Sequence, residues 1–147
     1  MSPDAVLAVT VSDLDYAALH AVYLLEADGT ESARTALVPL SRVRLPDSST
    51  GGQVRVRAKD LAIDIDHDRT GAWLSVVSPD LTADLRVHRP NRHEGLGVVV
   101  PWSDRLFQYT LKENTLPAEG TVRVGNRTVA PVRRPRAGDT RETWAWM

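Results

Sequence analysis

The chain has 147 residues, with 18 lysines and arginines against 19 aspartates and glutamates, and it contains no cysteine. This length fits one domain, and the near balance of charge argues against a nucleic-acid binder, which usually carries a basic excess. The lack of cysteine excludes disulfides, thiolate metal sites and cysteine nucleophiles, and it is compatible with the cytoplasmic location that we expect.

The first 25 residues predict two strands rather than an export signal. They carry Asp4, Asp13 and Asp15 and have neither a basic start nor a small-residue cleavage site, so they do not resemble a signal peptide. No uncharged apolar run reaches the roughly 18 residues of a membrane helix, and we expect no membrane span. Ala5–Val11 and Tyr16–Leu25 are apolar on both faces, as in strands that are covered on both sides. The helix formers at the start of the second run also permit a short helix there.

Three runs in the middle of the chain alternate strictly between apolar and polar residues. They are Gln53–Lys59, Asp60–Asp66 and Leu81–His88. Such alternation gives a strand one buried and one wet face, which is typical of antiparallel sheets. Glycine, proline and asparagine turn signals separate these runs from further short strands, with a final hairpin at Gly125-Asn126.

Regularly spaced short strands predict a mostly β fold, an antiparallel meander that forms a sandwich or a partial barrel. We expect residues 1–131 to make up this single antiparallel β domain. Residues 132–147 are rich in arginine and proline, and we expect them to form a C-terminal tail.

Acidic residues and histidines are the first candidates for a metal site. Asp64, Asp66 and Asp68 lie at a spacing of two beside the basic residues of Gln53–Lys59, which predicts a solvated sheet face with cross-strand ion pairs. The glycine and the closing glutamate of a calcium loop are missing. His67 could join other histidines only if the strands pair suitably. His20 lies in an apolar run, and we interpret it as a core histidine or as a polar group that faces a cavity. We therefore expect neither a metal nor a cofactor.

The densest cluster of aromatic and charged residues is the segment 101–120. Its candidate ligand-binding residues are Trp102, Arg105, Phe107, Tyr109 and Lys112. In a strand, Phe107 and Tyr109 share one face. Aromatic rings beside polar groups can line a ligand pocket. The closing strand of any β core needs the same rings, and from the residues alone this second interpretation is favoured.

The same segment resembles a motif of a bacterial family, domain of unknown function 2804. The family pattern is similar to P-W-x-x-x-R-F-x-Y-T-x-K followed by L-P-A-x-G and a short hairpin. The matching residues here are Pro101, Trp102, Arg105, Phe107, Tyr109, Thr110, Lys112, Leu116, Pro117, Ala118 and Gly120, with Leu106 inserted. The resemblance implies a fold distantly similar to lipocalin-like β domains, and hence a cavity for an apolar small molecule. It implies no established activity.

The C-terminal end departs from the family pattern. Members usually continue to a second motif similar to D-W-G-x-G-x-W-P-Y and W-N-W, of which only residues 143–146 keep an echo. This difference implies a truncated member. Such a chain would expose a sheet edge and an apolar face, and would form homo-oligomers through that edge.

Three functions follow as hypotheses. In the first, the domain binds an apolar small molecule of the lipid or isoprenoid class in a sheet-lined cavity, with Arg105 and Lys112 as anchors for its head group. In the second, the same scaffold is a hydratase, lyase or isomerase that uses Asp15 or Asp104 as a buried carboxylate and Tyr109 as proton donor. In the third, the chain is an interaction or structural fragment without a small-molecule site.

Overall fold

Twelve strands and no helix make up the part of the chain that this computed structural model describes, which comprises residues 5–14, 16–48, 51–113, 116–132 and 144–146. The strands are β1 (Ala5–Asp13), β2 (Ala17–Glu26), β3 (Glu31–Pro39), β4 (Gly52–Ala58), β5 (Leu61–Asp68), β6 (Gly71–Val77), β7 (Leu81–His88), β8 (Gly95–Pro101), β9 (Phe107–Glu113), β10 (Leu116–Val124), β11 (Arg127–Val132) and β12 (Trp144–Trp146). The predicted mostly β fold is confirmed, and the run Tyr16–Leu25 forms strand β2 rather than a helix. Since the described residues contain no helix, none of them could cross a membrane as a helix.

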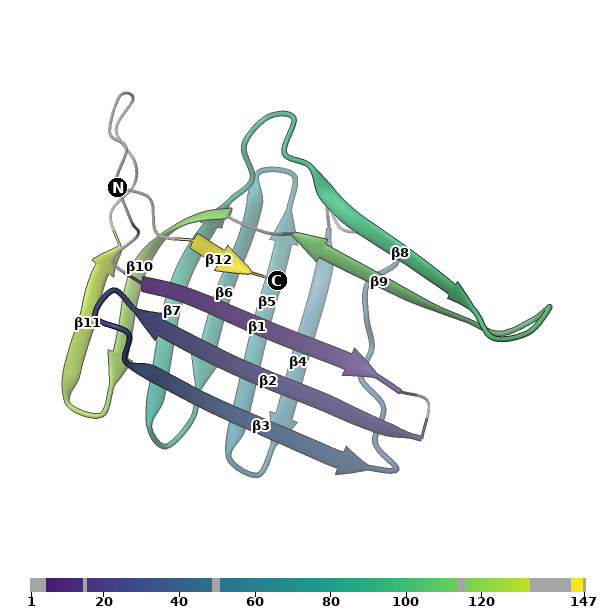
Figure 1. The fold of residues 1–147 in the computed structure, drawn as a ribbon, viewed down its shortest axis with the longest axis horizontal. Helices are drawn as coiled ribbons and strands as arrows, with labels where there is room; N and C mark the ends of the chain where they lie inside the picture. Colours follow the sequence, from purple (N-terminus) through teal and green to yellow (C-terminus); the bar gives the residue numbers. More distant parts are fainter. Residues whose placement is uncertain (1–4, 15, 49–50, 114–115, 133–143, 147) are drawn as a thin grey trace.

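Ten strands form one continuous sheet that folds over on itself. Its order is β3-β2-β1-β12-β10-β7-β6-β5-β4, and β11 pairs with β10 beside this path. All neighbours are antiparallel except β1 and β12, which run parallel. In Figure 1, β1–β3 form a front layer that crosses β4–β7 in the layer behind. The end strands β3 and β4 do not pair with each other, so the fold is a sandwich or partial barrel and not a closed barrel.

The space between the two layers is filled by side chains. Buried residues recur at every second position along most of β1, β2, β5, β6 and β7, and most of the apolar ones form one hydrophobic cluster. Leu7 and Leu24 enter it from the front layer, and Ile63, Leu74 and Leu85 enter it from the layer behind. At about 25 cal/mol per Å2 of apolar surface, this burial is the main stabilising contribution to the fold.

The outer face of the rear layer carries the predicted charge pairs. Arg55 Nη2 donates to both carboxylate oxygens of Asp66, at 2.7 and 2.9 Å, and Arg57 donates from Nη1 and Nη2 to one oxygen each of Asp64, also at 2.7 and 2.9 Å. Asp68 bonds instead with Arg86 of β7, and hydrogen bonds from Arg86 and Thr70 hold the pKa of its carboxyl far below its usual value. These carboxylates have structural partners, as the alternation of the sequence predicted.

Part of the predicted C-terminal tail belongs to the sheet. Residues 144–146 form β12, which lies between β1 and β10. Residues 133–143 and 147 lie outside the described residues. The domain boundary at residue 131 therefore stays a prediction.

Strands β8 and β9 form a separate two-stranded sheet. This β8–β9 hairpin leaves the top of the sandwich and extends to one side, with β8 as its outer strand (Figure 1). Strand β8 begins at Gly95 and ends at Pro101.

Candidate functional site

The β8–β9 hairpin has two faces of different composition. Residues that stand opposite each other in an antiparallel pair point to the same side. One face carries Gly95, Gly97, Val99, Pro101, Phe107, Tyr109, Leu111 and Glu113, and we call it the inner face. The outer face carries Leu96, Val98, Val100, Gln108, Thr110 and Lys112. The inner face is thus apolar along its length and ends in one carboxylate, Glu113.

The structure brings together only two of the five predicted ligand-binding residues. Phe107 and Tyr109 share the inner face, as predicted. Trp102 and Arg105 lie in the turn between the two strands, and Lys112 lies on the outer face. Lys112 therefore does not lie on the side of the hairpin that carries the two rings.

The three aromatic residues do not close the core. Trp102, Phe107 and Tyr109 are 69, 66 and 58% exposed. Tyr109 lies across Gly97 of the neighbouring strand, where a Cβ would stand 3.6 Å from its hydroxyl oxygen. The interpretation of these rings as core residues is not what the structure shows.

The carboxylates predicted for an enzyme are not found in a buried site. Asp104 is exposed in the turn of the hairpin, and Asp15 lies outside the described residues. The buried carboxylates of the described chain are Glu26 and Glu113 instead. Glu26 pairs with Arg127 at 2.7 and 2.8 Å, and these hydrogen bonds lower the pKa of its carboxyl.

Glu113 anchors the base of the hairpin in a cluster that we call the base cluster, made of His67, Arg89 and Glu113. Arg89 Nη2 donates a hydrogen bond of 2.6 Å to Glu113 Oε2, and both side chains are nearly buried. Burial lowers the pKa of His67, while the nearby charges of Glu113 and Arg89 act on it in opposite directions. Burial thus favours the neutral form of the His67 imidazole, while Arg89 and Glu113 form an ion pair of opposite charges.

His67 reaches this position because of the period of β5. Leu61, Ile63 and Ile65 point into the sandwich, and His67 is the next residue of the same row. Its Nδ1 atom is buried and makes no hydrogen bond within the described part of the chain. His20 lies on the inward face of β2, is buried, and leaves its own Nδ1 without a described partner. Burial lowers its pKa as well.

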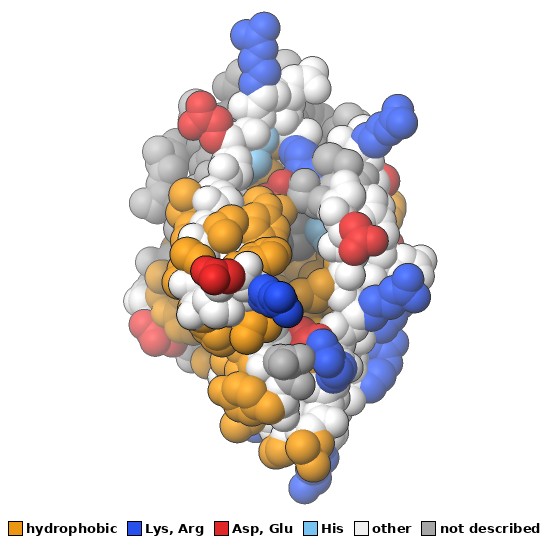
Figure 2. All heavy atoms as spheres, turned by 90° about the vertical axis from the view of Figure 1, so that its right-hand side faces the viewer, with side chains coloured by type: hydrophobic (Ala, Val, Ile, Leu, Met, Phe, Trp, Pro, Cys, Tyr) orange, Lys and Arg blue, Asp and Glu red, His pale blue; other side chains and the backbone are white. Residues whose placement is uncertain are grey.

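The end of the sandwich beneath the hairpin is hollowed. Figure 2 views this end, and hydrophobic side chains of the hairpin and of the neighbouring strands gather around the hollow. Histidine, acidic and basic side chains show at its border. Apolar walls with a few polar groups are the usual lining of a small-molecule site.

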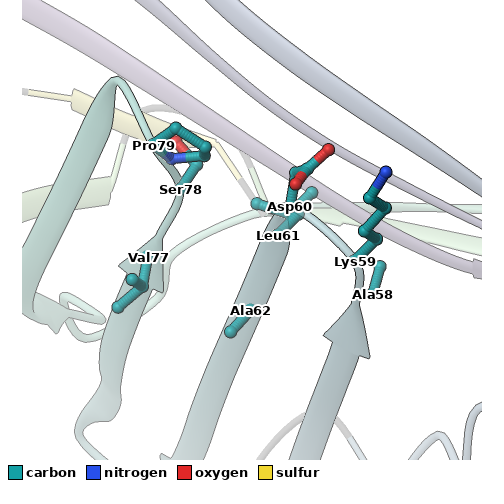
Figure 3. A pocket seen from close by; sticks show the side chains of 8 residues that line it. All are labelled: Ala58, Lys59, Asp60, Leu61, Ala62, Val77, Ser78 and Pro79. Atoms are coloured by element: carbon teal, nitrogen blue, oxygen red, sulfur yellow. The ribbon is translucent and has the colours of Figure 1, made fainter.

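A second depression lies at the opposite end of β5. It is an open groove of about 340 Å3 between the β4–β5 and β6–β7 turns, lined by residues 58–62 and 77–79 (Figure 3). Its walls include the charged Lys59 and Asp60 and none of the residues predicted for ligand binding. The groove is too open to enclose an apolar molecule.

The histidines do not assemble a metal site in the part of the chain that is described. His88 lies on the outward face of β7, where its Nε2 is 2.9 Å from Glu119 Oε1, whereas His67 points inward. No group of three histidine, aspartate or glutamate side chains among the described residues could hold a metal ion.

Sequence reasoning singled out neither Arg89 nor Glu113, although Glu113 lies within the segment 101–120 that it examined. No local signal marks this pair, because 24 residues separate its members and only the pairing of the strands brings them together. The alternation of β5 could have indicated the position of His67, because His67 follows Leu61, Ile63 and Ile65 in the row that points inward.

Comparisons with known proteins bear on the family alone. No curated protein and no solved structure matches the chain. The family described as "Domain of unknown function (DUF2804)" matches residues 1–138, which is nearly the whole chain. The chain belongs to this family.

Proposed function

We propose that this domain binds an apolar small molecule of the lipid or isoprenoid class in the hollow beside the inner face of the β8–β9 hairpin. The observation that supports this most is the meeting of two features at one place. An apolar, exposed inner face ends at a nearly buried polar cluster, and Figure 2 shows a hollow at this end of the molecule.

The exposed rings are available to a ligand. An aromatic side chain can bury about 150–250 Å2, and Phe107 and Tyr109 are more than half exposed. Covering them would contribute several kcal/mol at about 25 cal/mol per Å2, before the entropy cost of association. No rearrangement of the filled core is required.

The base cluster suggests which polar group the ligand carries. The charge of Arg89 is balanced by Glu113 at 2.6 Å, so a ligand carboxylate would compete with an existing buried ion pair. The neutral His67 can donate or accept one hydrogen bond at an atom without a described partner. We therefore favour a ligand with a neutral hydroxyl or carbonyl group over one with an anionic head group.

Titration with all-trans-retinol, an isoprenoid alcohol whose fluorescence rises in an apolar site, tests this proposal. The matched variants are Val99→Asp on the inner face and Val100→Asp on the outer face of the same strand. We expect Val99→Asp to weaken retinol binding at least tenfold, because it places a charge on the apolar wall. Val100→Asp is expected to bind like the wild type, and retinoic acid to compete poorly.

Equal effects of the two variants would contradict the assignment to the inner face. A lack of saturable binding by the wild type, together with no apolar molecule in a denaturing extract of the protein purified from cells, would overturn the proposal.

We also keep the prediction that the protein works in the bacterial cytoplasm, which the cysteine-free composition supports.

One observation favours an enzyme as the second candidate. The base cluster places a neutral imidazole near a buried carboxylate, and such groups transfer protons in hydratases and isomerases. The test is to incubate an extracted ligand with the protein in H218O and D2O. Isotope uptake that depends on His67 would support catalysis. An unchanged ligand mass would contradict catalysis and leave ligand binding as the function.

A further inference from the structure

The free sheet edges of this molecule are not alike. In the described part of the chain, β3, β4, β8, β9 and β11 each have one edge without a neighbouring strand, and β9 carries Lys112 and Glu113. Natural sheets protect such edges with charged side chains, because an unpaired row of backbone groups otherwise recruits another strand. Strand β3 contains Glu31 and Arg34, β4 contains Arg55 and Arg57, and β11 begins with Arg127.

Strand β8 has no such protection. Its sequence GLGVVVP holds no charged or polar side chain, and β9 is its only neighbour among the described strands. Figure 1 shows β8 on the side of the hairpin that points away from the sandwich. Its central residues Val98, Val99 and Val100 are uncharged and β-branched, and such residues favour pairing with another strand.

We infer that two copies of this chain associate through antiparallel pairing of their β8 strands. A two-fold axis at Val98 would set Val98 opposite its own equivalent, Leu96 opposite Val100, and Gly97 opposite Val99 of the second copy. The four-stranded ribbon has the order β9-β8-β8-β9. It leaves the inner face of each hairpin in place, so this inference does not rest on the proposed ligand.

A second copy fits this edge better than a different partner. In a two-fold interface the residue at the axis meets its own symmetry mate and the two copies present the same strand, so a strand with charges of one sign would repel its copy. The lack of charge in β8 removes that repulsion and offers no charge by which a different protein could be selected.

The hairpin also exposes many apolar side chains. Most of the large apolar side chains that the structure shows as exposed lie in the hairpin and its turn: Leu96, Val98, Val99, Val100, Trp102, Leu106, Phe107, Tyr109 and Leu111. A soluble monomer rarely exposes a contiguous apolar patch of more than a few hundred Å2. Pairing of two β8 strands would bring the exposed outer-face residues Leu96, Val98 and Val100 into contact with those of the second copy and would satisfy the unpaired backbone groups of the edge.

Cysteine cross-linking tests the register directly, because the natural chain contains no cysteine. Residues opposite each other in an antiparallel pair have Cβ atoms about 4.5–5.5 Å apart, close enough for a disulfide to form with small shifts. We expect Val98→Cys to form a covalent dimer under mild oxidation. Thr110→Cys is the control, since it lies on the same face and rung of the hairpin but two strands farther from its equivalent, and we expect it to remain uncross-linked.

Sedimentation equilibrium supplies the second readout. The wild type is expected to sediment as a dimer, and Val98→Lys as a folded monomer, because two ammonium groups would meet at the two-fold axis. Thr110→Lys adds the same charge to the same rung and is expected to stay dimeric. A monomeric wild type overturns the inference, even if the β8 amides are protected from hydrogen exchange, because another segment of the chain would then cover the edge. Equal cross-linking of Val98→Cys and Thr110→Cys also overturns it.

Discussion

In β5 of the sandwich, the large apolar residues lie on a buried face and the carboxylates lie on the outward face, whereas in the β8–β9 hairpin apolar residues are exposed on both faces. Both regions are antiparallel and both contain β-branched residues. They differ in what covers them. The sandwich covers its own apolar rows with a second layer, while the described residues place no such layer over the hairpin.

This difference separates stability from recognition. Burying the rows of the sandwich stabilises the fold, so these residues are explained by folding alone. The exposed residues of the hairpin contribute little to folding, and their solvation is unfavourable. Their presence indicates that something else covers them in the working protein, which we propose to be a ligand on the inner face and a second copy at the β8 edge.

The largest expected effect compares one residue from each region. Ile63 is completely buried and Phe107 is 66% exposed. Ile63→Ala is expected to lower the free energy of unfolding by about 2–5 kcal/mol, whereas Phe107→Ala is expected to change it by no more than about 0.5 kcal/mol. Urea unfolding followed by circular dichroism measures both. If the two losses were similar, the hairpin would be packed as tightly as the sandwich and the comparison would fail.

The next effect uses two glycines. Gly71 has a φ of +145°, and a Cβ there would collide with the carbonyl oxygen of Val87 in the neighbouring strand. Gly97 of the hairpin would place its Cβ in ordinary contact with Tyr109. Gly71→Ala is therefore expected to cost about 2–3 kcal/mol, and Gly97→Ala less than about 0.5 kcal/mol. Thermal unfolding of the two variants is a direct measurement, and a costly Gly97→Ala would show that the hairpin has a close neighbour.

The Arg89–Glu113 ion pair, at the base of the hairpin, gives a smaller and more local effect. Glu113→Gln keeps the shape of the side chain but leaves the nearly buried Arg89 without this counter-ion. We expect a loss of about 1–3 kcal/mol. Hydrogen exchange is expected to speed up most in β8 and β9 while β5 and β6 stay protected. Uniformly faster exchange would mean that the pair stabilises the whole fold and not the hairpin in particular.

Much of the sandwich could be predicted from the sequence, because alternation with period two reports directly on which face is buried. The same alternation predicted ion pairs between the acidic row of β5 and the basic row of β4, but not the individual partners or the pairing of Asp68 with Arg86. The shared face of Phe107 and Tyr109 was predicted correctly for the same reason.

The candidate site was less predictable. The alternation of residues along a strand tells which side chains share a face but not whether another layer covers that face. The exposure of Trp102 could therefore not be predicted from the residues around it in the sequence. The base cluster depends on the contact of β9 with the end of the sandwich, and this is a long-range property of the topology. Arg105 and Lys112 were grouped with the rings by sequence distance alone, whereas the turn and the strand period place them elsewhere.

The smallest expected effect is a dependence of stability on pH that comes from the sandwich and not from the hairpin. Burial lowers the pKa of His20 and of His67 below the usual 6.5, so the folded state takes up fewer protons than the unfolded chain. Above about pH 6.5 both histidines are neutral in the folded and the unfolded chain, and the fold has its full stability. As the pH falls towards the lowered pKa values, the unfolded chain takes up protons first, and the free energy of unfolding decreases. The free energy of unfolding is therefore expected to decrease from pH 7 to pH 5. His20→Leu is expected to reduce this slope, while Phe107→Ala, in a hairpin without histidine, is expected to keep it. A slope that is unchanged in His20→Leu would mean that His20 takes up its proton in the folded state as easily as in the unfolded chain, and that its position in the sandwich is more open than its burial implies.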